Sequence, residues 1–177
     1  MLAVSLQLFV RRSFAGTTVR DIAKGANLSP GLMFHYFDSK QALLEAHGRA
    51  VESAISSVVQ LLEASTQPLE TFRVIARMIL ESFQDEHSKN LFLLANQILT
   101  LDSIPATVRK MVSPSRSIAA SIPVIVQGQR LNEIRNGDAQ AMAVAFWGAL
   151  QGVAEVLTWS PGATIPDPEQ ILCILKA

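Results

Sequence analysis

Apolar residues in this chain repeat with the spacing of helices and almost nowhere with the alternation of strands. The first run, Leu2, Leu6, Phe9 and Val10, keeps the steps of an amphipathic helix and ends near residues 13–16. The same spacing returns later, and we expect further helices over roughly 68–86, 88–101, 105–112, 114–132, 139–159 and 168–176. No sustained two-residue period is present, so the pattern predicts an all-α protein.

Start and stop signals in the first third of the chain predict three short helices and then a long one. Thr17 or Thr18 can begin the second helix, because Thr18 and Asp21 have the spacing of a capping box, and Gly25-Ala26-Asn27 ends it. Ser29 and Pro30 begin a third helix over about 30–37, and Ser39 begins a fourth that continues through Leu62. Two helices joined by a few residues, the second short and freshly capped, are typical of a helix-turn-helix.

Charge and composition indicate what kind of partner and which compartment suit the protein. The chain of 177 residues has a net charge of zero, but residues 1–49 carry six basic and three acidic side chains, which hints at a polyanionic partner. A single cysteine, Cys173, excludes an intramolecular disulfide; its apolar neighbours predict a core thiol, and a reducing cytoplasm fits best. No signal peptide is evident, and Gln151 and Glu155 favour a buried helix over a membrane span at 139–159.

Signatures of chemistry are missing from the sequence. The histidines show no metal-ligand spacing, and neither a catalytic triad nor a carboxylate pair has a local signature. We therefore expect no enzyme activity, no catalytic residue, no metal site and no cofactor.

Residues 14–23, 28–31 and 36–44 closely resemble the N-terminal DNA-binding domain of the TetR family of transcriptional regulators. The motifs are FAGTTVRDIA, then LSPG, then YFDSKQALL, and the resemblance covers about residues 1–47 without a gap. It implies a helix-turn-helix domain over 1–47 and a helical effector-binding and dimerisation domain over 48–177. It also implies a double-stranded DNA operator as partner.

The resemblance implies that the third helix is the recognition helix. Its exposed residues would face the major groove, with Met33 and Phe37 turned into the small core; apolar side chains there can meet thymine methyls, and Tyr or His can reach phosphates. Arg20 would reach a base edge, while Thr18 and Lys40, at helix starts, would contact phosphate. The expected DNA-binding residues are Thr18, Arg20, Ser29, Pro30, Gly31, Leu32, Phe34, His35, Tyr36 and Lys40.

For the C-terminal half the resemblance implies a homodimer and an effector pocket. The helix at 139–159 is apolar nearly all round and so needs more than one partner; its small residues Ala145, Gly148, Ala149 and Gly152 form the expected dimer interface, with close packing inside one subunit as the alternative. The expected pocket for a small apolar effector is lined by Phe92, Asn96, Leu99, Phe146 and Leu150.

Four features depart from the family pattern. Leu32 stands where Thr is common, Phe34 where Tyr is common, and Ser13 where glycine usually ends the first helix; the basic arm that usually precedes that helix is also missing. We expect more apolar base reading, or a start site upstream of Met1. The sequence thus predicts a cytoplasmic, ligand-responsive repressor without a membrane partner; a helical carrier or sensor with weak or no DNA affinity is the alternative.

Overall fold

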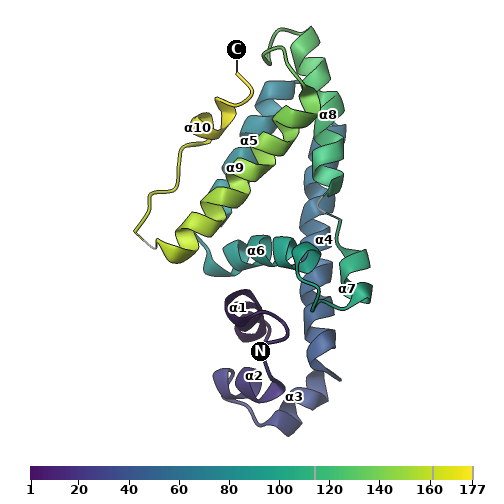
Figure 1. Cartoon of the computed structure of the whole chain (residues 1–177), viewed down its shortest axis with the longest axis vertical. Helices are drawn as coiled ribbons and strands as arrows, with labels where there is room; N and C mark the ends of the chain where they lie inside the picture. Colours follow the sequence, from purple (N-terminus) through teal and green to yellow (C-terminus); the bar gives the residue numbers. More distant parts are fainter. Residues whose placement is uncertain (114, 161, 177) are drawn as a thin grey trace. The chain divides into compact units, whose positions relative to one another are not determined.

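The computed structural model describes residues 1–113, 115–160 and 162–176, and the described residues form α-helices joined by turns and loops, without strands. Figure 1 shows their order. The helices are α1 (Leu2–Arg12), α2 (Val19–Gly25), α3 (Pro30–Tyr36), α4 (Lys40–Glu63), α5 (Pro68–Ser82), α6 (Glu86–Thr100), α7 (Ala106–Met111), α8 (Ser115–Arg130), α9 (Ala139–Trp159) and α10 (Pro168–Leu172). The all-α prediction is confirmed; the expected start of the eighth helix, at residue 114, lies outside the described residues.

The chain divides into two compact units. The first unit consists of Met1–Ser53 and Glu86–Ser113, and the second of Ala54–Asp85 and Pro114–Ala177. The first unit therefore adds α6 and α7 to the helix-turn-helix segment. The boundary between residues 47 and 48, drawn from the sequence, stays a prediction about domains.

The first unit is built around α1, whose Leu6 and Phe9 are fully buried. The α1 helix packs against α6, where the Gln97 Nε2 donates to the Val10 carbonyl at 2.9 Å. Ser5 Oγ lies 2.9 Å from the His47 Nε2 of α4, so a buried polar contact joins these two helices. The helix-turn-helix thus rests on α4 and α6.

The caps of the helix-turn-helix are those the sequence predicts. Thr18 and Asp21 form the capping box of α2, and Asn27 takes the left-handed conformation at φ 55°. Ser29 accepts from the Leu32 amide at the start of α3, with Pro30 in the first turn. Ser13, where the family usually has glycine, adopts φ 62° and ψ 166°, a region that favours glycine.

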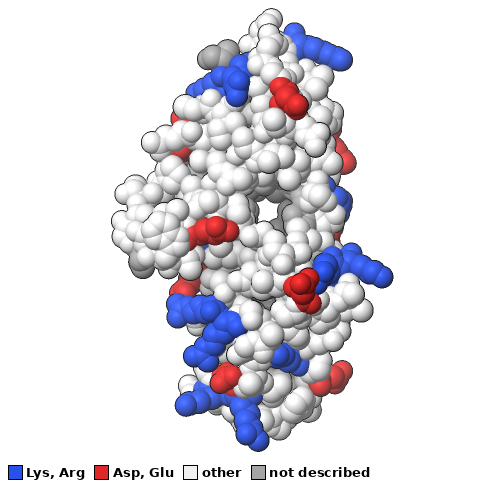
Figure 2. Space-filling view, in the orientation of Figure 1, with Lys and Arg blue, Asp and Glu red and all other residues white. Residues whose placement is uncertain are grey.

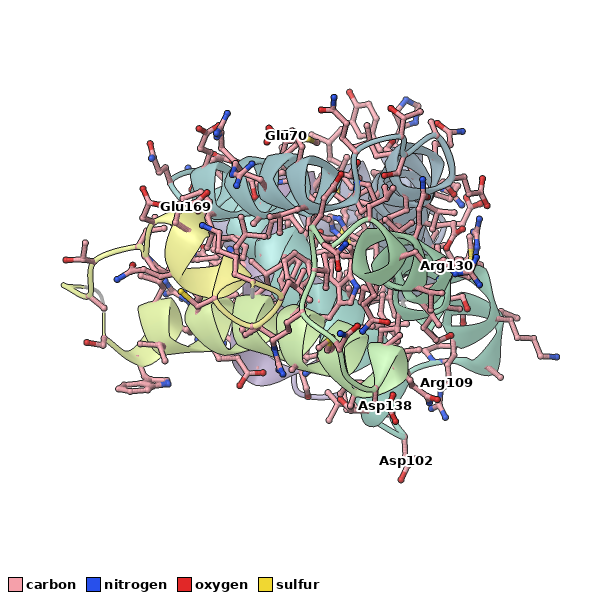
Figure 3. All side chains as sticks on the ribbon, turned by 90° about the horizontal axis from the view of Figure 1, so that it is seen from above. Glu70, Asp102, Arg109, Arg130, Asp138 and Glu169 are labelled. Atoms are coloured by element: carbon pink, nitrogen blue, oxygen red, sulfur yellow. The ribbon has the colours of Figure 1, made fainter. Side chains whose placement is uncertain are left out.

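The second unit is a bundle of α5, α8, α9 and α10. Phe72 of α5 meets Phe146 of α9 edge to face, with ring centroids 5.0 Å apart. Arg73 of α5 bonds Glu70 and, at 2.6 Å, Glu169 of α10; Figure 3 labels both carboxylates. Hydrogen bonds from Lys176 and then Arg73 hold the pKa of Glu169 below its ordinary value. These ion pairs fix α10 against α5.

The α8 helix ends at Arg130, close to the end expected near residue 132. Asn132 takes the left-handed position at φ 56°, and the amides of Asn132 and Glu133 bond the Gln129 and Gly128 carbonyls, which closes the helix as a Schellman motif. Asp138, labelled in Figure 3, caps α9 as predicted.

The expectation of a buried Cys173 thiol is wrong. The end of the chain buries Ile171, Leu172 and Leu175, and this spacing turns Cys173 to the opposite, exposed side. Its thiol donates to the Glu169 carbonyl at 3.3 Å. An apolar run in the sequence does not reveal which side of so short a helix meets the core.

Candidate DNA-binding surface

The α3 helix presents most of its side chains to solvent. Met33 is fully buried, as expected, and Phe37 is half-buried. Exposure is 42% for Leu32, 49% for Phe34 and 65% for Tyr36. Met33 thus lies in the core as expected, whereas Phe37 is only partly covered, and DNA contact by the exposed side chains stays a prediction.

The N-cap and first turn of α2 precede α3 in the sequence and carry two of the expected DNA-binding residues, Thr18 and Arg20. Arg20 is available for contact, whereas Thr18 is already hydrogen-bonded. Arg20 is exposed in the first turn of α2. The Thr18 hydroxyl donates to the Asp21 carboxylate at 2.6 Å, and this bond, followed by the bond from the Thr18 amide, lowers the pKa of Asp21. The proton that Thr18 would offer to a phosphate is therefore already used within the cap.

The Lys40 ammonium is held inside the first unit. Its Nζ donates to the carbonyls of Phe14 at 2.7 Å and Thr17 at 2.8 Å, and lies 4.1 Å from the centre of the Phe14 ring. Burial lowers the pKa of Lys40. Two of its three N–H donors thus brace the loop between α1 and α2, and a phosphate contact remains a prediction for the third.

Lys and Arg side chains gather around the helix-turn-helix. Figure 2 shows several in the region where Figure 1 places α2 and α3. Arg12, Arg20 and Lys24 are exposed there, and Arg11 pairs with Glu86 at 3.5 Å while it stays largely exposed. The surface therefore combines an apolar helix with flanking positive charge.

The expected effector-pocket residues fall in two units. Phe92, Asn96 and Leu99 lie on α6 in the first unit, and Leu99 is 40% exposed. Phe146 and Leu150 lie on α9 in the second unit, where both are fully buried in the core. Their joint role in a pocket stays a prediction.

Two open grooves in the second unit lie elsewhere, at about 320 and 260 Å³. Their lining residues come from α5 with residues 165–168, and from the α4–α5 connection, respectively. Neither contains an expected pocket residue. Among the described residues, no group of three His, Cys, Asp or Glu side chains is placed to hold a metal ion.

The small residues of α9 are exposed or half-buried within the described chain. A Cβ atom added at Gly148 or Gly152 would meet nothing within 4 Å, so these glycines serve no close packing inside the subunit. Ala145 is exposed and Ala149 is half-buried. By length and composition α9 could also cross a membrane, with a mean hydropathy of 1.4 and 28% of the tested window buried.

These features define a helix-turn-helix protein with a C-terminal helical bundle. Residues 1–47 match the family described as "Bacterial regulatory proteins, tetR family". The HTH-type transcriptional repressor KstR2 of Mycolicibacterium smegmatis is 29% identical over 90 residues, which cover 50% of this chain and 44% of that repressor. The aligned region thus spans less than half the length of that relative.

Solved structures share the fold over nearly the whole chain. The TetR family regulator PfmR from Thermus thermophilus has a TM-score of 0.72 at 18% identity, covering 97% of this chain and 92% of that one. A transcriptional regulator from Saccharomonospora viridis, solved in complex with choline, has a TM-score of 0.70 at 22% identity. The match covers 97% of this chain and 91% of that one. The chain therefore shares the fold of these regulators, and its residues 1–47 match the tetR family.

Sequence reasoning missed the polar contacts that hold the DNA-binding segment together. The contact of Ser5 with His47 joins residues 42 positions apart, and the bond from Gln97 to Val10 joins residues 87 apart. The available signal was the presence of Ser5 and His47 in amphipathic helices, but the sequence does not show that these two residues contact each other.

Proposed function

We propose that this protein is a transcriptional repressor that binds a near-palindromic operator as a homodimer and is released by a small apolar effector. The observation that carries the proposal is the exposed side of α3, in a segment that matches the family over residues 1–47. The named repressor relative supports repression as the direction of control. A DNA-binding repressor of this kind would act in the cytoplasm.

DNA as the partner is supported by the surroundings of α3. The exposed cations Arg12, Arg20 and Lys24 lie on α1 and α2, and phosphate neutralisation by such side chains supplies sequence-independent affinity. A major groove about 12 Å wide admits a helix such as α3. In a two-fold dimer the two α3 helices would read half-sites about 34 Å apart, one turn of DNA, or a little more.

Binding of selected duplex DNA tests this function. Full-length protein is used to select sequences from random duplex DNA at low salt. Enrichment of a near-palindrome supports the repressor, whereas absence of enrichment would overturn DNA recognition and leave the helical carrier or sensor. Arg20→Ala should relax the preference at one base position at a cost of about 1–3 kcal/mol, and equal loss on random DNA would contradict a base contact.

The homodimer is supported by an apolar stripe along α9. Val144 (51% exposed), Gly148, Gly152, Val156 (37%) and Trp159 (74%) follow one another at helical spacing. The opposite side of α9 packs into the second unit, so the stripe is the remainder of a helix that is apolar nearly all round. Its two open glycines would allow another helix to approach closely.

Substitution within this stripe tests the dimer. Gly148→Glu places a charge where a Cβ meets nothing within one chain, so the subunit should fold while the dimer dissociates. Gly162→Glu is the matched control, because Gly162 also has open space around its Cβ but lies outside α9. Sedimentation analysis should give a smaller species for Gly148→Glu alone. A wild-type monomer would refute the proposal.

The effector would meet the side of α6 that carries Phe92, Asn96 and Leu99. Phe92, Asn96 and Leu99 lie opposite the side of α6 from which Gln97 reaches Val10 and on which Leu94 is buried. A ligand on this side would therefore act on the helix that supports α1. Apolar compounds that raise the melting temperature should also release operator DNA, and Leu99→Asp should abolish both effects; release unaltered by Leu99→Asp would exclude this side of α6.

A further inference from the structure

Helical geometry defines which residues of α3 lie in the middle of its exposed side and which lie at the edges. Because successive helical residues are about 100° apart, a side chain at 33 has residues 31 and 35 on the opposite side of the helix. Met33 is fully buried, so Gly31 and His35 mark the middle of the exposed side. Leu32 and Phe34 lie to the left and right of that middle. The helix thus presents Gly31 and His35 between two apolar flanks, Leu32 and Phe34.

The chemistry of this side limits what it can read. The sequence of α3 is PGLMFHY, which contains no Lys, Arg, Asn or Gln. These four residue types make the common specific hydrogen bonds to guanine and adenine in the major groove. The Ser29 side chain just before α3 already accepts from the Leu32 amide. The apolar group that a base edge offers in the major groove is the C5-methyl group of thymine.

The described part of the chain leaves these two apolar flanks partly open, since Leu32 is 42% and Phe34 49% exposed. Their surroundings favour DNA as the occupant, because the neighbouring exposed side chains of α2 include Arg20 and Lys24. A phosphate backbone complements those charges. An apolar protein surface would leave them without partners.

We propose that Leu32 and Phe34 read the C5-methyl groups of thymine in each operator half-site, while Gly31 lets the α3 backbone come close to the base edges. This inference rests on the proposed function, and it assigns the base preference that α3 contributes. Thymine is then the base that Leu32 and Phe34 select by direct contact.

Removal of single methyl groups tests the proposal. In the selected operator, each thymine of a half-site is replaced in turn by deoxyuridine, which keeps base pairing and lacks only the methyl. Affinity should fall about fourfold at each contacted position, the effect of leaving one methyl-sized group without an apolar partner. Deoxyuridine outside the half-sites is the control and should leave affinity unchanged.

Protein variants assign the methyl groups to side chains. Leu32→Ala should bind thymine and deoxyuridine equally at one position, and Phe34→Ala at another. Met78→Ala is the matched control, because Met78 is 47% exposed but lies on α5, so it should keep the full methyl dependence. Gly31→Ala meets no neighbour within 4 Å; it should fold normally and lower affinity for every operator.

The outcomes separate this inference from the proposed function. If no palindrome is selected, DNA recognition fails and this inference fails with it. If a palindrome is selected but its half-sites lack thymine, or deoxyuridine binds as well as thymine, methyl reading is wrong while the repressor stands. If Leu32→Ala and Phe34→Ala both retain the methyl dependence of the wild type, the two side chains are not the readers.

Discussion

The buried histidine of the first unit makes acid stability a direct test of the fold. His47 of α4 is only 3% exposed, lies 2.9 Å from Ser5 Oγ, and meets the Phe9 ring edge to face at 6.1 Å between ring centroids. The Ser5 hydroxyl donates to the Leu2 carbonyl at 3.0 Å, so a neutral His47 with its proton on Nε2 completes the chain of hydrogen bonds. A second proton on His47 would place a charge among apolar groups.

The size of the effect follows from the pKa of His47. Burial, and to a smaller extent the charge of His87, lowers this pKa from 6.5 to about 4. Between these values the unfolded chain binds a proton at residue 47 that the folded chain does not, so acid favours unfolding. At about 1.36 kcal/mol per pKa unit, the free energy of unfolding should fall by about 3 kcal/mol from above pH 6.5 down to pH 4.

Urea unfolding of the full chain, followed by far-ultraviolet circular dichroism, measures this loss at pH values between 6.5 and 4. His47→Gln is the comparison, because Gln has no ionisable group and keeps an amide donor near Ser5. Carboxylates titrate in both proteins, so the difference between the two curves isolates His47. At neutral pH the variant should be the less stable protein, and the gap should close and reverse toward pH 4. Parallel curves would refute the buried neutral histidine.

Two further pairs of substitutions test the backbone and the caps. Ser13→Gly should raise the free energy of unfolding by about 1 kcal/mol, because a non-glycine residue at φ 62° and ψ 166° is strained. Asn27→Gly, at a left-handed position that Asn tolerates, should change this free energy little. A lower stability of Ser13→Gly in thermal unfolding would contradict the strain. Asp138→Ala should cost about 1 kcal/mol, because the Asp138 carboxylate accepts from the Gln140 and Ala141 amides. Asp138→Asn keeps an acceptor and should lose less; equal losses would point to charge rather than capping.

The sequence predicts the helices of this fold well because their limits are set by local contacts. The Thr18–Asp21 capping box, Ser29 before Pro30, and Asp138 all act on amides two or three residues away, and such spacing is visible in a sequence. The exact end of α8 was harder to predict, because Asn132 and Gly137 both suit a left-handed turn. The choice between them depends on how the chain folds back on Gly128 after the helix has ended.

The sequence predicts the binding surface less well, because contacts between residues far apart in the chain determine which side chains are available there. The sequence places Lys40 at a helix start, where phosphate contact is a reasonable expectation, but it does not reveal that the Phe14 and Thr17 carbonyls, 26 and 23 residues earlier, converge on the same ammonium. The two roles have different signatures. Bracing of the loop predicts that Lys40→Ala lowers the free energy of unfolding by about 2 kcal/mol, since hydrogen bonds to charged groups are among the stronger ones.

Phosphate contact predicts instead that Lys40→Ala weakens binding to all DNA sequences alike and lowers the slope of log affinity against log salt by about one. Urea unfolding and a salt titration of operator binding, made on the same variant, therefore separate the roles. With two of its three donors on carbonyls, Lys40 can fulfil both, and the slope then falls together with stability. An unchanged slope with reduced stability would remove Lys40 from the DNA contacts and leave exposed cations such as Arg12, Arg20 and Lys24 to contact phosphate.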